Sequence, residues 1–261
     1  MISKSHNFFL LLPSPWALIV RVNSFRLFFS FILFIKFNIL QNFLLNVVIL
    51  RIVSFSWWIF YRNEFNLEGK NSSALERGLK FAIILFISSE IFFFFSFFWS
   101  YFHFFLSPTL ETSIEWPPFG ILIFDYSNVP LINTLILISS GVTVTIRHFY
   151  LVKGNAKKKN YYLFLTCLLG IMFTFLQLQE YIRSFFRIRD ASFGTTFFIL
   201  TGFHGIHVII GSIFLMCTLL RRLNIISRKK EFLRFELASW YWHFVDVVWL
   251  FLYFIIYYIN F

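Results

Sequence analysis

The stretch that decides the fold runs from Phe193 to Leu220 and reads FGTTFFILTGFHGIHVIIGSIFLMCTLL. On a helix, His204, His207 and Gly211 fall within about 60° of one another. In a membrane, glycine lets helix backbones approach closely, whereas an imidazole is costly unless it faces protein, water or a lipid headgroup. One side of this segment is therefore predicted to make close helix contacts. The predicted packing residues are Gly202, Gly205, Gly211 and His204.

A second apolar stretch, ELASWYWHFVDVVWL at residues 236–250, carries a histidine and an acid near the C-terminus. His243 and Asp246 are three residues apart and so share one face of a helix. Asp246 would lie about 15 Å from the start of that helix, near the middle of a bilayer. The pair could shuttle protons, or it could be the commoner polar contact that fixes helix packing.

Glu90 is a third polar feature within an apolar run, about 18 Å into its predicted helix. A carboxyl group at that depth should be protonated or paired. Two interpretations remain open on the sequence alone. Glu90 is either a proton-relay or gating group, or a neutral acid that is hydrogen-bonded to a neighbouring helix.

The composition indicates a polytopic membrane protein, because 59% of the 261 residues are hydrophobic and only 13% are charged. The net charge of +11 comes from basic residues in short segments between apolar spans. These are typical of juxtamembrane anchors, so no nucleic acid partner is expected. Cys167 and Cys217 form no disulfide framework or metal motif, and we expect both to be buried thiols.

Hydropathy predicts an all-α fold with membrane-spanning helices and no separate soluble domain. Arg21, Arg26 and Lys36 interrupt the first apolar segment, so hydropathy alone leaves one or two helices before Trp57. With two helices there, the chain has seven spans. They cover residues 17–37, 40–61, 78–106, 131–148, 161–181, 192–220 and 235–258.

The distribution of Lys and Arg gives an orientation. With seven spans, 16 basic residues fall on the side of the N-terminus and only 4 on the other side. The positive-inside rule then places the N-terminus on the matrix or cytoplasmic side. The first residues, MISKSHNFFLLLPSPW, lack the pattern of an imported mitochondrial presequence, which favours synthesis inside an organelle or a bacterium.

His204, His207 and His243 could in principle ligate a metal or haem. No carboxylate shares the histidine face of residues 193–220, and nothing resembles a cysteine-rich copper loop. We therefore expect no metal and no catalytic residue in this chain.

The motifs TGFHGIHVIIG and WYWHFVDVVWLFLY, in this order, resemble the subunit III family of the haem–copper oxidases, in its cytochrome c oxidase branch. The resemblance covers residues 13–258. It implies a single membrane domain, 1–261, with a two-helix arm at 13–61, a turn at Lys36–Asn38 and a five-helix bundle at 73–261. The two parts would form a V-shaped lipid cleft. Arg21 and Arg26 depart from the family's apolar first helix.

The same resemblance implies roles for individual residues. Glu90, in ISSEIFFF, matches the family's carbodiimide-reactive glutamate, and with Asp246 and His243 it is a proton-related candidate. The other candidates are lipid anchors of an aromatic belt with charged headgroup contacts. They are Trp57, Trp58, Arg62, Glu64, His207 and Arg221.

The implied function is that of a non-redox core subunit of cytochrome c oxidase, in respiratory complex IV. Haem a and copper would belong to partner subunits I and II, while this chain would bind phospholipids and support assembly, proton uptake and stability. Its location would be the mitochondrial inner membrane, or the plasma membrane of a bacterium. Accessory subunits are expected as further partners, and a respiratory supercomplex stays open.

Two alternatives are weighed against this interpretation. A quinol oxidase subunit III would usually lack the two N-terminal helices, so residues 13–58 favour the cytochrome c branch. A stand-alone proton-coupled transporter using Glu90 and Asp246 should show repeat symmetry between its halves. The sequence shows no such symmetry.

Overall fold

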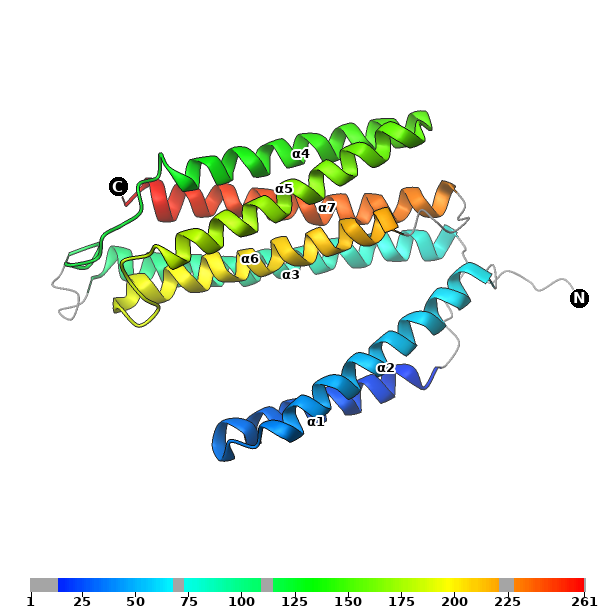
Figure 1. The fold of residues 1–261 in the computed structure, drawn as a ribbon, viewed down its shortest axis with the longest axis horizontal. Helices are drawn as coiled ribbons and strands as arrows, with labels where there is room; N and C mark the ends of the chain where they lie inside the picture. The colour runs from blue at the N-terminus through cyan, green and yellow to red at the C-terminus, as the bar shows by residue number, and fades with distance from the viewer. Residues whose placement is uncertain (1–13, 68–72, 109–114, 221–227, 261) are drawn as a thin grey trace, which may run out of the picture. The chain divides into compact units, whose positions relative to one another are not determined.

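The computed structural model describes residues 14–67, 73–108, 115–220 and 228–260, without the side chains of residues 61–67, 73–75 and 228–230. Most of these residues are helical (Figure 1). The helices are α1 (Trp16–Phe37), α2 (Leu40–Leu67), α3 (Ser73–Leu106), α4 (Val129–Lys153), α5 (Ala156–Ile182), α6 (Ala191–Leu220) and α7 (Arg228–Leu252), which a π-helical turn (Tyr253–Tyr258) continues. Among the described residues, seven helices are long and apolar enough to cross a membrane, which confirms the predicted fold class.

The turn between α1 and α2 lies where the sequence predicted it. Asn38 adopts a left-handed conformation, with φ of 59°, and its N–H donates to the Phe34 carbonyl at 2.8 Å. Asparagine tolerates this conformation better than most residues with a side chain. The region before Trp57 thus forms two helices rather than one.

The polar ends of several helices extend beyond their predicted spans. α4 continues to Lys153 and ends at Gly154, whose φ of 75° suits glycine. Asn155 then caps α5 by accepting a hydrogen bond from the Lys158 N–H at 3.2 Å. The run Lys157–Lys159, which the sequence analysis left between spans, is therefore helical because a local cap stabilises it.

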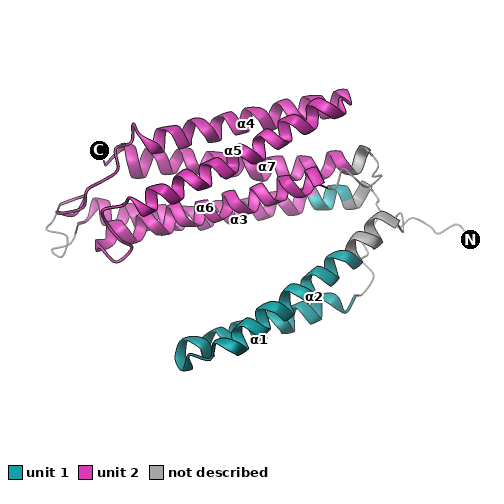
Figure 2. Cartoon of the chain, in the orientation of Figure 1, with its two compact units in different colours: residues 1–79 teal, residues 80–261 magenta. Residues whose placement is uncertain are grey.

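Contacts divide the chain into residues 1–79 and 80–261, which group α1 with α2 and α3 to α7 with one another (Figure 2). The boundary falls within the first turns of α3. In the first unit, α1 and α2 pack along one stripe, with ring contacts between Trp16 and Phe60 and between Phe34 and Phe43. Ser30 is the only buried side chain described on these two helices. Most of their surface thus faces outward.

In the second unit, α7 has the most buried span, half of it inside the protein. The Trp242 and Trp249 side chains are fully buried there. Their indole N–H groups donate to the Ser140 and Thr134 hydroxyls of α4, at 2.9 and 3.0 Å. A buried indole needs such a partner, so these two bonds fix how α7 lies against α4.

α3 joins this unit through long aromatic side chains. Phe93 makes an edge contact with Phe203 of α6, with ring centroids 5.0 Å apart. Phe94 similarly contacts His207, at 5.1 Å. Large rings fill the space between these helices, as dispersion contacts require in a protein interior.

Gly211 of α6 packs directly against Trp242 of α7. A Cβ atom at this position would lie 2.9 Å from the Trp242 ring, closer than carbon atoms can pack. The other two predicted packing glycines differ from it. A Cβ at Gly202 would meet only the Tyr181 hydroxyl, at 3.9 Å, and one at Gly205 would meet nothing within 4 Å.

Replacement of Gly211 by alanine should destabilise the protein by about 1–3 kcal/mol, because Trp242 is enclosed and cannot move aside. The matched control is Gly205→Ala on the same helix, which should be neutral or slightly stabilising because alanine favours the helix by about 1 kcal/mol. Thermal unfolding of the two variants in detergent measures the difference. Equal unfolding temperatures would contradict the assigned close approach.

Candidate functional site

Glu90 of α3 and His207 of α6 meet within the second unit. The Glu90 Oε2 and His207 Nε2 atoms are 2.9 Å apart, and His207 Nδ1 lies 2.7 Å from the Phe203 carbonyl oxygen. His207 is 8% exposed. The phenylalanine rings at 93, 94 and 244 and the Tyr241 ring surround it. The carboxyl group that the sequence placed in an apolar run therefore has a partner 117 residues away.

The hydrogen bonds of His207 restrict where its protons can lie. A carbonyl oxygen only accepts, so Nδ1 must carry a proton to bond Phe203. Nε2 then either accepts a proton from a neutral Glu90 or donates one to an ionised Glu90. In both cases one proton lies between Glu90 and His207, and the pair can hold it at a fixed position between α3 and α6.

Asp246 and His243 also lie close together on α7, but they are not hydrogen-bonded. The distance between His243 Nδ1 and Asp246 Oδ2 is 3.9 Å. Gly141 of α4 lies against the same carboxyl group, and a Cβ there would come within 2.8 Å of Oδ2. The sequence spacing therefore predicted correctly that the two side chains lie close together. Whether they also form a hydrogen bond depends on their rotamers, which the sequence does not specify.

The remaining predicted residues lie in different surroundings. His204 is buried between Trp249 and Phe173, with ring centroids 5.2 and 5.5 Å away, and acts there as a packing side chain. Trp58 is 67% exposed on α2. The side chains of Arg62 and Glu64, and all of Arg221, lie outside the described residues. Trp57 is half-buried, and lipid binding by any of these residues stays a prediction.

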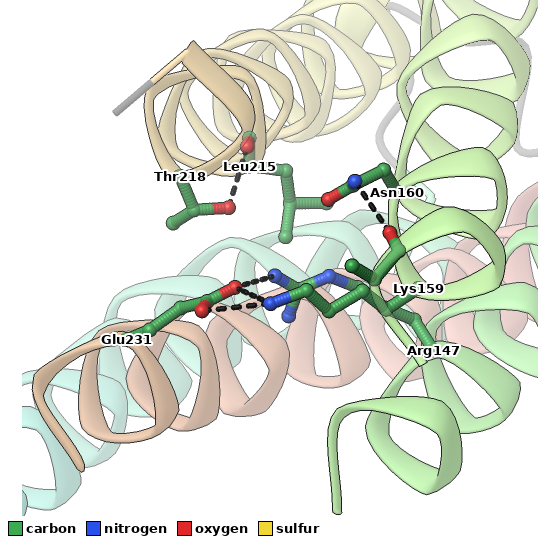
Figure 3. A network of polar contacts seen from close by, with 7 residues as sticks. Arg147, Lys159, Asn160, Leu215, Thr218 and Glu231 are labelled. Atoms are coloured by element: carbon green, nitrogen blue, oxygen red, sulfur yellow. Dashed lines mark hydrogen bonds and ion pairs between the residues drawn. The ribbon is translucent and has the colours of Figure 1, made fainter. Parts of the chain in front are cut away.

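A buried ion-pair network connects α4, α5 and α7, and the sequence analysis did not find it (Figure 3). Lys159 Nζ donates to both Glu231 oxygens, at 2.6 and 2.8 Å. The Arg147 guanidinium is 1% exposed, lies 3.7 Å from Glu231 and packs over the Phe235 ring at 3.6 Å. In the sequence analysis, Arg147 was one of the 16 basic residues on the side of the N-terminus, with no partner assigned. Its partner could not be found because Glu231 belongs to a helix that is distant in the sequence.

A second polar cluster that the sequence analysis missed lies near the other ends of these helices. Glu180 is 2% exposed and interacts electrostatically with the Tyr257 hydroxyl. Within the described residues, neither of its oxygens has a hydrogen bond shorter than 3.5 Å. Glu180 lines a cavity of about 410 Å³ together with Asp125 and Arg183. The one available signal was the i,i+3 spacing of Gln177 and Glu180 on a predicted helix.

Asp125 lies in the connection before α4, outside the spans. Its Oδ1 atom accepts hydrogen bonds from the Ser127 hydroxyl at 2.7 Å and from the Ser127 N–H at 2.9 Å. These two bonds lower the pKa of Asp125 below its ordinary value. The carboxylate is therefore charged at neutral pH, and it organises the turn that leads into α4.

The thiols and possible metal ligands lie apart from one another in the part of the chain that is described. There, no three His, Cys, Asp or Glu side chains come together as metal ligands would. Cys167 is buried, but Cys217 is exposed on the surface of α6. The prediction of two buried thiols is thus wrong for Cys217, because no described residue of the second unit covers its face of the helix.

Comparison with known proteins finds similarity to one family along nearly the whole chain. The family model described as cytochrome c oxidase subunit III matches residues 6–261. Curated relatives named cytochrome c oxidase subunit 3 include that of Drosophila melanogaster, 45% identical over 97% of each chain. Those of Tetraodon nigroviridis and Salmo salar are 44% and 43% identical over 98% of each chain.

Removal of the Glu231 carboxylate should destabilise the protein by roughly 1–3 kcal/mol, because it leaves the buried Arg147 charge without its counter-ion. Partial exposure of Glu231 keeps the expected loss below that of a fully buried pair. The measurement is the unfolding temperature of Glu231→Gln in detergent. Arg147→Met combined with Glu231→Gln should recover most of the loss, and Lys157→Gln, at an exposed lysine on α5, is the control. A double variant less stable than Glu231→Gln would contradict this account.

Proposed function

The chain belongs to the cytochrome c oxidase subunit III family, and on this premise we propose that it serves the oxidase as a subunit without haem or copper. The complex to which such a subunit belongs is a proton-translocating oxidoreductase that oxidises cytochrome c and reduces oxygen to water. Haem a and copper would be held by partner subunits I and II. The observation that carries the proposal is the similarity to this family over residues 6–261.

We place the chain in the mitochondrial inner membrane, with its N-terminus in the matrix and its C-terminus in the intermembrane space. The relatives come from animals, which supports the mitochondrial assignment. The orientation is supported by the 16 to 4 distribution of basic residues across the seven spans.

Within the oxidase, we propose that the Glu90–His207 pair takes part in proton uptake. Its shared proton lies between two helices, beside the aromatic rings that contact His207, and the Glu90 side chain is 20% exposed, so the pair can exchange its proton with groups outside the bundle. Proton transfer from Glu90 Oε2 to His207 Nε2 leaves a carboxylate beside an imidazolium, which stabilise each other in a low-dielectric site. His243 and Asp246 are further candidates, since Asp246 is a second acid within the spans.

We also propose that the chain binds phospholipids through its interfacial aromatic and charged residues. Trp58 is exposed near the end of its span, where an amphipathic ring favours the headgroup region. The same role is proposed for Trp57, Arg62, Glu64, His207 and Arg221. For His207, a phosphate oxygen would have to compete with Glu90 for Nε2. The V-shaped cleft stays a prediction.

Spectroscopy of the native complex tests the proposed function. The chain is purified from native membranes in mild detergent, and the reduced-minus-oxidised spectrum is recorded before and after its partners are removed. We expect a-type haem absorbance in the intact preparation and none in the isolated chain. If the isolated chain keeps haem, or if the intact preparation never contains it, the proposed function is wrong.

The proton role is tested by Glu90→Gln in the intact oxidase, with the number of protons pumped per electron as the measurement. Glutamine can still hydrogen-bond His207 but cannot release a proton, so a required relay predicts a lower ratio. The control is Glu115→Gln, which removes an exposed carboxylate outside the spans. An unchanged ratio in Glu90→Gln would reject a required relay.

A further inference from the structure

Two arginines lie at the middle of the spans in the first unit. Arg26 is about 15 Å from either end of α1, and Arg51 is about 15 Å from either end of the span Leu40–Phe60. Both are about 18–20 Å along their helices from the turn at Asn38, so the hairpin brings them to nearly the same depth. In a hydrocarbon core about 30 Å thick, this depth is close to the centre.

Around these two charges, the described part of the first unit offers no counter-ion. Both side chains are exposed, and neither forms a hydrogen bond or ion pair with any described residue of α1 or α2. Residues 16–60 contain no Asp or Glu at all. Nearby polar groups already bond their own helix, as Asn23 and Ser24 do with the carbonyls of the preceding turn. The two helices therefore cannot neutralise Arg26 or Arg51 themselves.

Lipid headgroups are too far away to do so. An arginine side chain extends about 7 Å, which lets residues near helix ends reach the interface. The interface is within reach of Arg21, which lies about 8 Å from the start of α1, and of Lys36, which lies at the end of α1. Arg26 and Arg51 lie too deep to reach the interface. A charge that faces lipid at this depth is strongly unfavourable.

A second copy of residues 16–60 is also an unsuitable neighbour, because this segment would bring more positive charge and no acid. The surface around the arginines is instead apolar. Val22 and Phe29 on the face of Arg26 are 51% and 55% exposed, and Val48 and Phe55 on the face of Arg51 are 52% and 65% exposed. An arginine within an apolar rim is typical of the centre of a protein interface.

We propose that Arg26 and Arg51 dock the two-helix unit onto a transmembrane helix of another subunit, which presents a carboxylate at the middle of the bilayer. The proposal rests on the proposed function, since it requires the chain to assemble with other subunits. The ion pairs would be shielded from lipid by the surrounding apolar side chains. They would fix the depth at which the two helices lie against their partner, because a one-turn shift would separate the charges.

Leucine substitutions test this proposal by the direction of their effect. In the intact oxidase, Arg26→Leu and Arg51→Leu leave the partner carboxylate buried and unpaired. We expect the chain to dissociate from the complex in detergent at least about tenfold more readily. If either arginine faced lipid, leucine would be the better residue, and retention of the chain would be unchanged or improved. That outcome for both arginines would overturn the proposal.

Control variants separate the charge from general packing. Arg26→Lys and Arg51→Lys keep the charge and should retain the chain better than the leucine variants. Arg21→Leu removes an arginine that can reach the interface, and Phe29→Leu trims the apolar rim. Neither control should change retention by more than about twofold. Haem still accompanies the wild-type chain if only this docking proposal fails, which distinguishes it from failure of the proposed function.

Chemical modification of the native complex gives a second test that needs no variant. Phenylglyoxal, which reacts with arginine, is applied to the detergent-solubilised oxidase and to the released chain, and the modified peptides are measured by mass spectrometry. We expect modification of Arg26 and Arg51 to be at least about tenfold slower in the complex. Equal rates in the complex and in the released chain would overturn the proposal.

Discussion

The structure depends on one constraint, which is that hydrocarbon offers no partner for a polar group. Helices satisfy the backbone within each span, and small polar side chains satisfy themselves on the preceding turn. Thr201 does so at the Phe197 carbonyl and Ser140 at the Leu137 carbonyl. Only groups too large for such local bonds need another helix. In the second unit, Trp242, Trp249 and Lys159 make interhelical contacts of this kind.

The two tryptophans of α7 show how this requirement gives specificity. Dispersion contacts among leucine and phenylalanine side chains are favourable over a wide range of helix rotations. The indole N–H bonds of Trp242 and Trp249 to α4 are satisfied at only one rotation and one depth. Gly211 then lets α6 approach the Trp242 ring. Apolar packing therefore holds the bundle together, and a few directional bonds select its arrangement.

The charged residues divide the chain into two contrasting parts. In the second unit, Glu231 lies beside Lys159 and Arg147, and Glu90 lies beside His207, so these acids have partners within the unit. In the first unit, residues 16–60 carry arginines and contain no acid. A bundle that balances its own charges can fold as a unit in the membrane. A pair of helices with unbalanced charges is better suited to an assembled complex, where a neighbour supplies the counter-ion.

The positions of single helices could be predicted from the sequence, because hydropathy and a 3.6-residue period depend only on local order. The later spans and the shared face of His243 and Asp246 follow from this, whereas the turn at Asn38 was implied by the family resemblance. The depth of Glu90, Arg26 and Arg51 along their helices follows from the rise per residue.

The sequence motifs also determined the family, since long runs in the right order are specific. What only the tertiary structure decided is which side chain meets which. The rotation and neighbours of whole helices determine that His207 is the partner of Glu90 and that Glu231 is the partner of Arg147. They also determine that Gly211, rather than Gly205, makes the close contact. Rotation is set by many weak contacts summed over distant segments, and no single local pattern encodes that sum.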